Sequence, residues 1–139
     1  MLAELLGSVG ADVAIVPPFF CDYGRNTSVG SRVFVNTGCV ILDCARVEIG
    51  DDVQVGPGVH LYAASHPLHP GARRSGLELA APVTIGSDVW LAGRLVVCPG
   101  RAHRRRVDDR RGKCRGARHP GRGRGRRQPL PRRQVHRRR

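Results

Sequence analysis

The sequence predicts an all-β fold, a parallel β-helix, because a six-residue apolar repeat runs through most of it and small residues follow several repeated positions. A helix would place apolar residues three and four positions apart, and a half-buried strand would alternate them every second residue. A period of six is typical of a parallel β-helix, in which each hexad forms one flat side of a triangular coil. The repeated residues are Val29, Val35 and Ile41, then Ile49, Val55 and Leu61, then Ile85, Leu91 and Val97.

A second apolar set and a set of small residues follow the same period. We expect the apolar residues to point inward and stack on their counterparts, and the small residues to lie where the chain turns a corner. The second apolar set comes four positions after the first, at Val33, Cys39, Val53, Val59, Val89 and Leu95. The small residues are Gly30, Gly50, Gly56, Gly86 and Ala92.

Residues 1–28 precede this repeat and are predicted to form a separate segment. Residues 1–10 predict a short helix, because their leucines are helically spaced and Gly7 is a suitable end. Residues 11–20 are apolar and end in a Pro pair and two Phe, so we expect them to lie extended against the core.

The repeat itself is predicted to span residues 29–100, with two interruptions. Residues 43–48 add two positions to the register, whereas residues 63–81 break it altogether and contain the strings SHPLHP and RRSGLE. A repeat protein can project an insertion from its wall without disturbing the stack, and loops on a rigid scaffold are common functional sites. We therefore expect 63–81 to be a protruding, functional loop.

The charge of the chain divides sharply after residue 100. Residues 1–100 contain six arginines and nine acidic residues, whereas residues 101–139 contain seventeen arginines and one lysine against two acidic residues. The second segment has almost no aliphatic residues and no periodicity, so its composition predicts disorder. The net charge of +13 for the whole chain would favour a nucleic-acid partner, but only 4% of the residues are aromatic, which is few for a base-stacking surface.

Several other classes of protein are excluded by simple patterns. No apolar run approaches the roughly 20 residues that cross a membrane, and no signal-peptide pattern is visible. The five cysteines form no Cys-x-x-Cys pair, so we expect neither a zinc ribbon nor a disulfide framework. The expected location is a reducing cytoplasm.

From about Leu2 to Gly100 the chain resembles the maltose, galactoside and nodulation sugar O-acetyltransferases. The string SHPLHP, followed by RRSGLE and then PVTIGSDVW, is far more specific than the six-residue repeat alone. The resemblance implies a left-handed β-helix, a homotrimer with active sites between subunits, acetyl-CoA as co-substrate and a sugar or small hydroxyl compound as acceptor. It also implies that residues 1–28 are the remnant of a helical segment that covers the acceptor site.

By the same resemblance, His66 is the catalytic base and Asn36 stabilises the oxyanion. A neutral imidazole titrates near the working pH and can remove the proton of an attacking hydroxyl. An amide NH2 group can donate to the oxygen of a tetrahedral intermediate. The alternatives are a solvated loop histidine and a corner asparagine with no catalytic role. His60 and His69 are interpreted as ordinary turn and loop residues.

The resemblance places acceptor-binding residues at Asp22, Phe34, Asp43 and Glu78. Carboxylates suit sugar hydroxyls because each accepts more than one hydrogen bond, and Phe34 would pack against the sugar ring. Some relatives have a second acid after Asp43, where this chain has Cys44. The identity of the acceptor is therefore left open.

The residues implied in acetyl-CoA binding are Trp90, Ala92 and Gly93, where an indole and small residues would flank the pantetheine arm. Packing between subunits is the alternative for Trp90. No metal-binding or phosphate-loop motif is present in the sequence, and no metal is expected.

After Gly100 the chain departs from the family, which continues with one more coil and a closing segment that contacts CoA. Arginine dominates residues 101–139, as expected when GC-rich codons are read out of frame. Back-translated and shifted by one base, residues 110–132 can give a typical family C-terminus. We therefore expect a frameshift, with impaired activity as its consequence.

Two other functions are alternatives to an acetyltransferase. A non-catalytic trimeric scaffold would assemble without binding acetyl-CoA. An arginine-rich segment such as residues 101–139 would bind nucleic acid nonspecifically through phosphate contacts.

Overall fold

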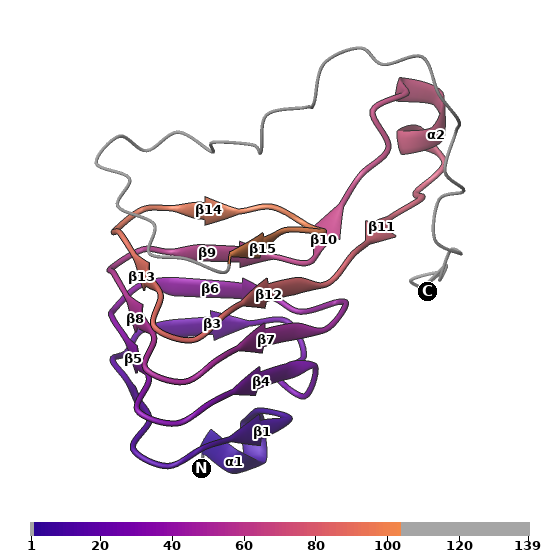
Figure 1. Ribbon diagram of the computed structural model, residues 1–139. Helices are drawn as coiled ribbons and strands as arrows, with labels where there is room; N and C mark the ends of the chain where they lie inside the picture. The colour runs from indigo at the N-terminus through magenta and orange to yellow at the C-terminus, as the bar shows by residue number, and fades with distance from the viewer. Residues whose placement is uncertain (1, 104–139) are drawn as a thin grey trace, which may run out of the picture.

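A computed structural model describes residues 2–103, and these form the predicted left-handed parallel β-helix (Figure 1). Three parallel sheets line the sides of the triangular coil. The first sheet contains β1 (Ser8–Val9), β4 (Thr27–Val29), β7 (Val47–Ile49), β12 (Val83–Ile85) and β15 (Ala102–His103). The second contains β2 (Ala14–Ile15), β5 (Phe34–Val35), β8 (Gln54–Val55) and β13 (Trp90–Leu91). The third contains β3 (Phe19–Cys21), β6 (Cys39–Leu42), β9 (His60–Tyr62) and β14 (Val96–Val97).

The two apolar sets predicted from the repeat fill the interior of the coil, and every member of both sets is buried. Parallel register places like residue on like residue: Val29 pairs with Ile49, which pairs with Ile85, and Val35 pairs with Val55. Removing these aliphatic side chains from water is the main favourable contribution to the fold. The repeat period thus predicted which residues form the core.

Small residues occupy a corner between sheets because successive coils approach closely there. A Cβ atom built on Gly30 would lie 2.7 Å from the carbonyl carbon of Gly50, and one on Gly50 would lie 2.7 Å from the nitrogen of Ser87. Real Cβ atoms do not tolerate such distances. The predicted role of the small residues at corners is confirmed at these positions.

The β-helix begins earlier than the sequence predicted. Helix α1 is only Leu2–Leu5, and β1, β2 and β3 already form a first coil that pairs with β4, β5 and β6 of the next one. Val9, Ile15 and Cys21 follow the six-residue period and pack against the core, but the Pro17-Pro18 pair, which is cis, interrupts their pattern. The six-residue period therefore continues through residues 9–21, which the predicted boundary at residue 29 leaves out.

The coil also extends past residue 100, where the arginine-rich segment was predicted to begin. Ala102 and His103 pair in parallel with Thr84 and Ile85 of β12. Residues 104–139 lie outside the described part of the chain, and so do the predictions of disorder and of a frameshift that fall on them.

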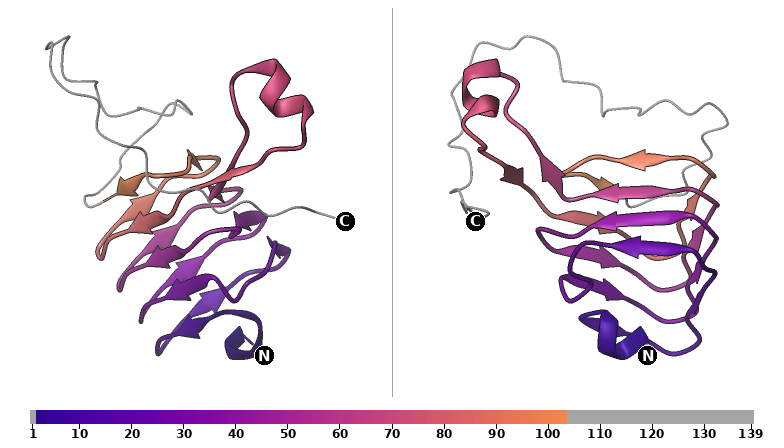
Figure 2. Two further views of the ribbon diagram at one scale, coloured as in Figure 1. Left: turned by 90° about the vertical axis from the view of Figure 1, so that its right-hand side faces the viewer. Right: turned by 180° about the vertical axis from the view of Figure 1, so that it is seen from behind.

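The predicted insertion at 63–81 leaves the wall of the coil as an arm, which projects to one side in Figures 1 and 2. At its base β10 (Ala64–Ser65) pairs antiparallel with β11 (Leu79–Ala80), and helix α2 (Pro70–Arg74) lies near its tip. The guanidinium of Arg73 donates to the carbonyl oxygens of Pro67 and Leu68 at 3.1 and 3.2 Å. These bonds link α2 to the residues that precede it at the tip. The Leu68 side chain is almost fully exposed there.

The outer surfaces of the three sheets differ in chemistry. In each list that follows, the residues are stacked in register and point outward. The first sheet presents Ser8, Ser28, Glu48 and Thr84. The second presents Ala14, Phe34, Gln54 and Trp90. The third presents Phe20, Val40, His60 and Val96. The first sheet is thus polar outside, whereas the other two present large apolar and aromatic groups.

Thr27 is the exception in the buried core. Its hydroxyl oxygen is buried and has no hydrogen-bond partner within the described chain, and it stacks on Val47, which in turn pairs with Val83. We expect Thr27→Val to raise the free energy of unfolding by about 1–2 kcal/mol, because an unsatisfied buried hydroxyl is replaced by a methyl group of similar shape. Urea denaturation at fixed protein concentration measures this.

The matched control for this prediction is the reverse change one coil along. Val47→Thr introduces a second hydroxyl into the same column and should destabilise the protein by a comparable amount. Equal stability of wild type and Thr27→Val would contradict the assignment of an unsatisfied hydroxyl.

Candidate active site

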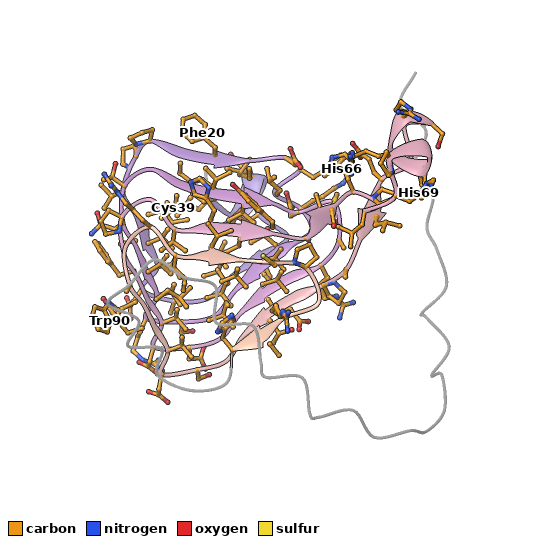
Figure 3. All side chains as sticks on the ribbon, turned by 90° about the horizontal axis from the view of Figure 1, so that it is seen from above. Phe20, Cys39, His66, His69 and Trp90 are labelled. Atoms are coloured by element: carbon orange, nitrogen blue, oxygen red, sulfur yellow. The ribbon has the colours of Figure 1, made fainter. Side chains whose placement is uncertain are left out.

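His66 lies at the base of the arm, directly after β10 (Figure 3). The antiparallel register pairs Ala64 with Ala80 and Ser65 with Leu79, so His66 and Glu78 are the residues that adjoin the last pair of this ladder. The His66 side chain is exposed and makes no hydrogen bond to another of the described residues. An accessible imidazole next to a carboxylate-bearing position is suited to proton transfer.

Asn36 lies at the corner that follows β5. Its backbone N–H donates to the carbonyl of Val55 at 2.9 Å, and its side-chain Oδ1 accepts the N–H of Thr37 at 2.8 Å. Within residues 2–103 the Nδ2 group has no partner, so it can donate to a bound group. This geometry suits the predicted oxyanion contact.

Trp90 is 43% exposed on the outer face of the second sheet, where it stacks on Gln54 and then on Phe34. At the adjoining corner the N–H of Asn36 donates to the carbonyl of Val55, and in the next coil the N–H of Gly56 donates to the carbonyl of Leu91. Asn36, Gly56 and Ala92 therefore lie at the same corner in successive coils. The predicted residues Phe34, Asn36, Trp90, Ala92 and Gly93 therefore share one corner of the molecule. We call these five residues the Trp90 half-site.

Three more of the predicted residues gather near the arm. Burial raises the pKa of the Cys44 thiol, and the carboxylates of Asp22 and Glu78 raise it further, so both charges lie within electrostatic reach of the sulfur. Since Glu78 and His66 adjoin the same end of the β10–β11 ladder, we treat these side chains as a second group. We call Asp22, Cys44, His66 and Glu78 the His66 half-site.

A single copy of the chain keeps the two half-sites apart. Seen from above in Figure 3, Trp90 lies on the left-hand side of the triangular coil and His66 on the right, where the arm departs. The predicted catalytic base and the predicted acetyl-CoA residues are therefore not brought together within one chain.

Asp43, which is predicted to bind the acceptor, is buried inside the protein. Its side chain is fully buried, and its carboxylate accepts the backbone N–H groups of Tyr23, Gly24 and Asn26 at 2.8, 3.1 and 3.1 Å. Both oxygens are thus engaged inside the protein, and no surface is left for a sugar hydroxyl. The geometry favours a structural role, because a buried carboxylate is retained only where its charge is hydrogen-bonded.

Asn26 is a partner of this arrangement that the sequence analysis did not single out. Its side-chain Nδ2 donates to the backbone carbonyl of Asp43 at 2.8 Å. The sequence signal that marks this turn is the eight-residue step from Cys21 to Val29, which matches the step from Ile41 to Ile49. The pair is visible only when two coils are stacked.

The residues that the structure describes form neither a cluster of metal-binding side chains nor a long helix. No three His, Cys, Asp or Glu side chains between residues 2 and 103 are grouped as a metal ion would require. The described helices, α1 and α2, have four and five residues, so neither is long enough to cross a membrane.

Comparison with known proteins gives a consistent result over this β-helix. The chain is 50% identical over 99 residues to nodulation protein L of Rhizobium meliloti (strain 1021), an alignment that covers 71% of this chain and 54% of that protein. Over its β-helix, the chain belongs to the hexapeptide-repeat acetyltransferases. No family model matches the sequence.

Two solved structures of hexapeptide-repeat acetyltransferases extend the comparison to three dimensions. The enzyme from Vibrio cholerae O1 biovar eltor, in complex with acetyl coenzyme A, superposes with a TM-score of 0.71 at 36% identity, covering 73% of this chain and 55% of that one. A maltose O-acetyltransferase from Clostridium difficile 630 superposes with a TM-score of 0.71 at 42% identity, covering 73% and 54%. The chain spans about half the length of the curated relatives it matches.

The electrostatics of the His66 half-site can be tested without substrate. Asp22→Asn removes one of the charges that raise the pKa of Cys44, so the thiolate fraction should increase. We expect the alkylation rate of Cys44 by iodoacetamide near neutral pH to rise roughly twofold or more. Mass spectrometry that locates the modified residue measures this rate.

Asp12→Asn serves as the control for this experiment. Asp12 is an exposed acid at another corner and is not among the charges that act on Cys44. Equal increases in the two variants would show that Asp22 has no particular proximity to the thiol.

Proposed function

We propose that the chain is an acetyl-CoA-dependent O-acetyltransferase that acts on a sugar or another small hydroxyl compound. The observation that supports this most directly is the superposition of its β-helix on an acetyltransferase structure with bound acetyl coenzyme A. The likeness to a maltose O-acetyltransferase favours a sugar acceptor.

In the proposed reaction His66 removes the proton of the acceptor hydroxyl as its oxygen attacks the thioester carbonyl carbon. The new C–O bond converts the carbonyl to a tetrahedral oxyanion, which the Nδ2 group of Asn36 stabilises by donating a hydrogen bond. Collapse of this intermediate breaks the C–S bond, and the departing sulfur takes the proton from the His66 imidazolium. Each proton and electron pair is thus accounted for by the two side chains and the two substrates.

The Trp90 half-site has a composition that suits an extended thioester substrate. The indole of Trp90 is exposed beside Gly93, which is also exposed, and Ala92 is small. An aromatic face beside accessible backbone can flank an apolar chain with amide groups. We propose that these three residues bind acetyl-CoA.

Because the half-sites of one copy lie apart, the proposed enzyme requires a second copy, and we propose a homotrimer. A contact between two different faces generates a closed ring when the rotation from one copy to the next closes, and a rotation of one third of a turn gives a trimer. The apolar outer faces of the second and third sheets are suited to such contacts, whereas the polar first sheet is suited to water. His66 of one copy would then meet Trp90 of the next.

The proposal includes a cytoplasmic location, an acceptor that is a small molecule, and activity lowered by the departure from the family pattern after Gly100. A non-catalytic trimeric scaffold is the second candidate and would assemble without binding acetyl-CoA. Nonspecific nucleic-acid binding would depend on residues 101–139, of which 104–139 lie outside the described part of the chain. Isothermal titration with acetyl-CoA separates the enzyme from the scaffold.

Replacing His66 tests the base directly. His66→Ala should lower the rate of acetyl transfer to a galactoside, maltose or glucose acceptor by about 10²- to 10⁴-fold, the usual contribution of general-base catalysis. Acetyl-CoA affinity should be unchanged. Free CoA release, followed with a thiol reagent, measures the rate.

His69→Ala is the matched control, because His69 is an exposed histidine on the same arm (Figure 3). It should leave the rate within about twofold of wild type. Equal rates for wild type and His66→Ala would remove His66 from the mechanism.

The proposed assembly is tested on the third sheet. Phe20 is 58% exposed at the edge of its apolar outer face. Phe20→Arg places a charge in the proposed contact, where an unpaired charge is costly to bury, and should shift the protein from trimer to monomer in sedimentation velocity. Ser28→Arg changes an outward residue of the polar first sheet and should leave the trimer intact. A wild-type chain that sediments as a monomer would contradict the proposal.

A further inference from the structure

The buried carboxylate of Asp43 organises a turn that is one coil away from it. Its Oδ1 accepts two backbone N–H groups, from Tyr23 and Gly24, and its Oδ2 accepts a third, from Asn26. The Asn26 side chain returns a bond to the Asp43 carbonyl. Hydrogen bonds to an ionised group are stronger than those between neutral groups, so this set fixes the turn firmly.

The same turn is held from its other side. Gly24 has a φ of +71°, and a Cβ atom there would lie 2.2 Å from the carbonyl oxygen of Leu5. The Gly24 carbonyl also accepts the N–H of Thr27 at 2.8 Å. The turn is therefore enclosed between α1 and the Asp43 carboxylate and has little freedom to move.

Asp22 lies between two anchors at the end of β3. Its backbone N–H donates to the carbonyl of Ile41 in the neighbouring coil at 3.2 Å, and the next residue, Tyr23, is the first that Asp43 holds. Asp22 acts electrostatically on two thiols, those of Cys21 and Cys44, and Cys44 directly follows Asp43 in the chain. Asp43 thus connects, by hydrogen bonds on one side and by the chain on the other, two members of the His66 half-site.

We propose that Asp43 is a positioning residue: its buried carboxylate holds the Tyr23–Asn26 turn and thereby helps to fix Asp22 where β3 ends, near Cys44 on the acceptor side of the site. The acceptor side itself rests on the proposed function. Asp43 touches neither substrate in this proposal and acts by keeping Asp22 in place.

The first test uses Asp43→Asn, which keeps the shape but converts one carboxylate oxygen into an NH2 donor. That donor would face backbone N–H groups, so the turn should loosen. We expect the KM for the acceptor to rise roughly tenfold, while the KM for acetyl-CoA stays within about twofold. Val53→Ala, a fully buried core change that leaves the turn untouched, is the control for general destabilisation and should change neither KM.

The second test does not depend on activity. If Asp43 positions Asp22, then Asp43→Asn should increase the alkylation rate of Cys44 in the same direction as Asp22→Asn. In the Asp22→Asn background, Asp43→Asn should add no further increase, because the two changes act through one interaction. If Asp43→Asn does not fold, Asn26→Ala removes a single bond of the set and should give a smaller increase in the same direction.

The two tests fail in distinguishable ways. A wild-type chain without acetyl transfer to any acceptor would remove the proposed function and leave the thiol measurement as the test of positioning. An unchanged Cys44 rate in folded Asp43→Asn or Asn26→Ala, alongside a changed rate in Asp22→Asn, would overturn the positioning role. Independent, additive effects of Asp22→Asn and Asp43→Asn would overturn it as well.

Discussion

The stacking of each coil on the next in parallel register is the constraint on which the rest of the structure depends. Backbone N–H groups of one coil donate to carbonyls of the neighbouring coil at equivalent positions, as Gly30 does to Ile49 and Gly50 does to Ile85. A coil that slipped by one residue would turn its aliphatic side chains outward and lose both the ladder and the core. Corner size, core composition and the placing of insertions all follow from keeping this register.

The register makes the interior uniform and leaves the exterior free to differ. Inside, columns of valine, isoleucine and leucine repeat with little variation, whereas the three outer faces range from polar to aromatic. A binding surface can therefore be assembled from one outward residue per coil, as in the stack of Phe34, Gln54 and Trp90. On the proposed assembly, such a surface meets the arm of another copy.

Much of the fold could be predicted from the sequence because its core residues recur every six positions. The six-residue repeat predicted the core positions from Val29 to Val97, and the break in it predicted the arm. The first coil was not predicted because Pro17-Pro18 interrupts the period there. Strand β15 was not predicted because Ala102 and His103 lie within an arginine-rich segment. Prolines near one end of the repeat and arginines near the other thus hide the period that the strands follow.

The candidate site was less predictable, because it depends on contacts between coils that no spacing encodes. The position of Asp43 in the sequence resembles that of an acceptor ligand, but only the stacked coils show that three N–H groups of a turn 17–20 residues earlier occupy its carboxylate. The separation of His66 from Trp90 is likewise a property of the triangular cross-section (Figure 3). Sequence reasoning can name such residues, and the fold decides which of them meet.

The arm is anchored where it leaves and re-enters the coil. The N–H of Ala81 donates to the carbonyl of Ala63 at 3.0 Å, and Val47 still pairs with Val83 as though no residues had intervened. The residues between these anchors can change in length and sequence while the folding of the coil stays the same. The arm is therefore an exchangeable module: on the proposed function, an arm grafted from one such protein onto another would change the acceptor that is recognised at its base, while the coil folds as before.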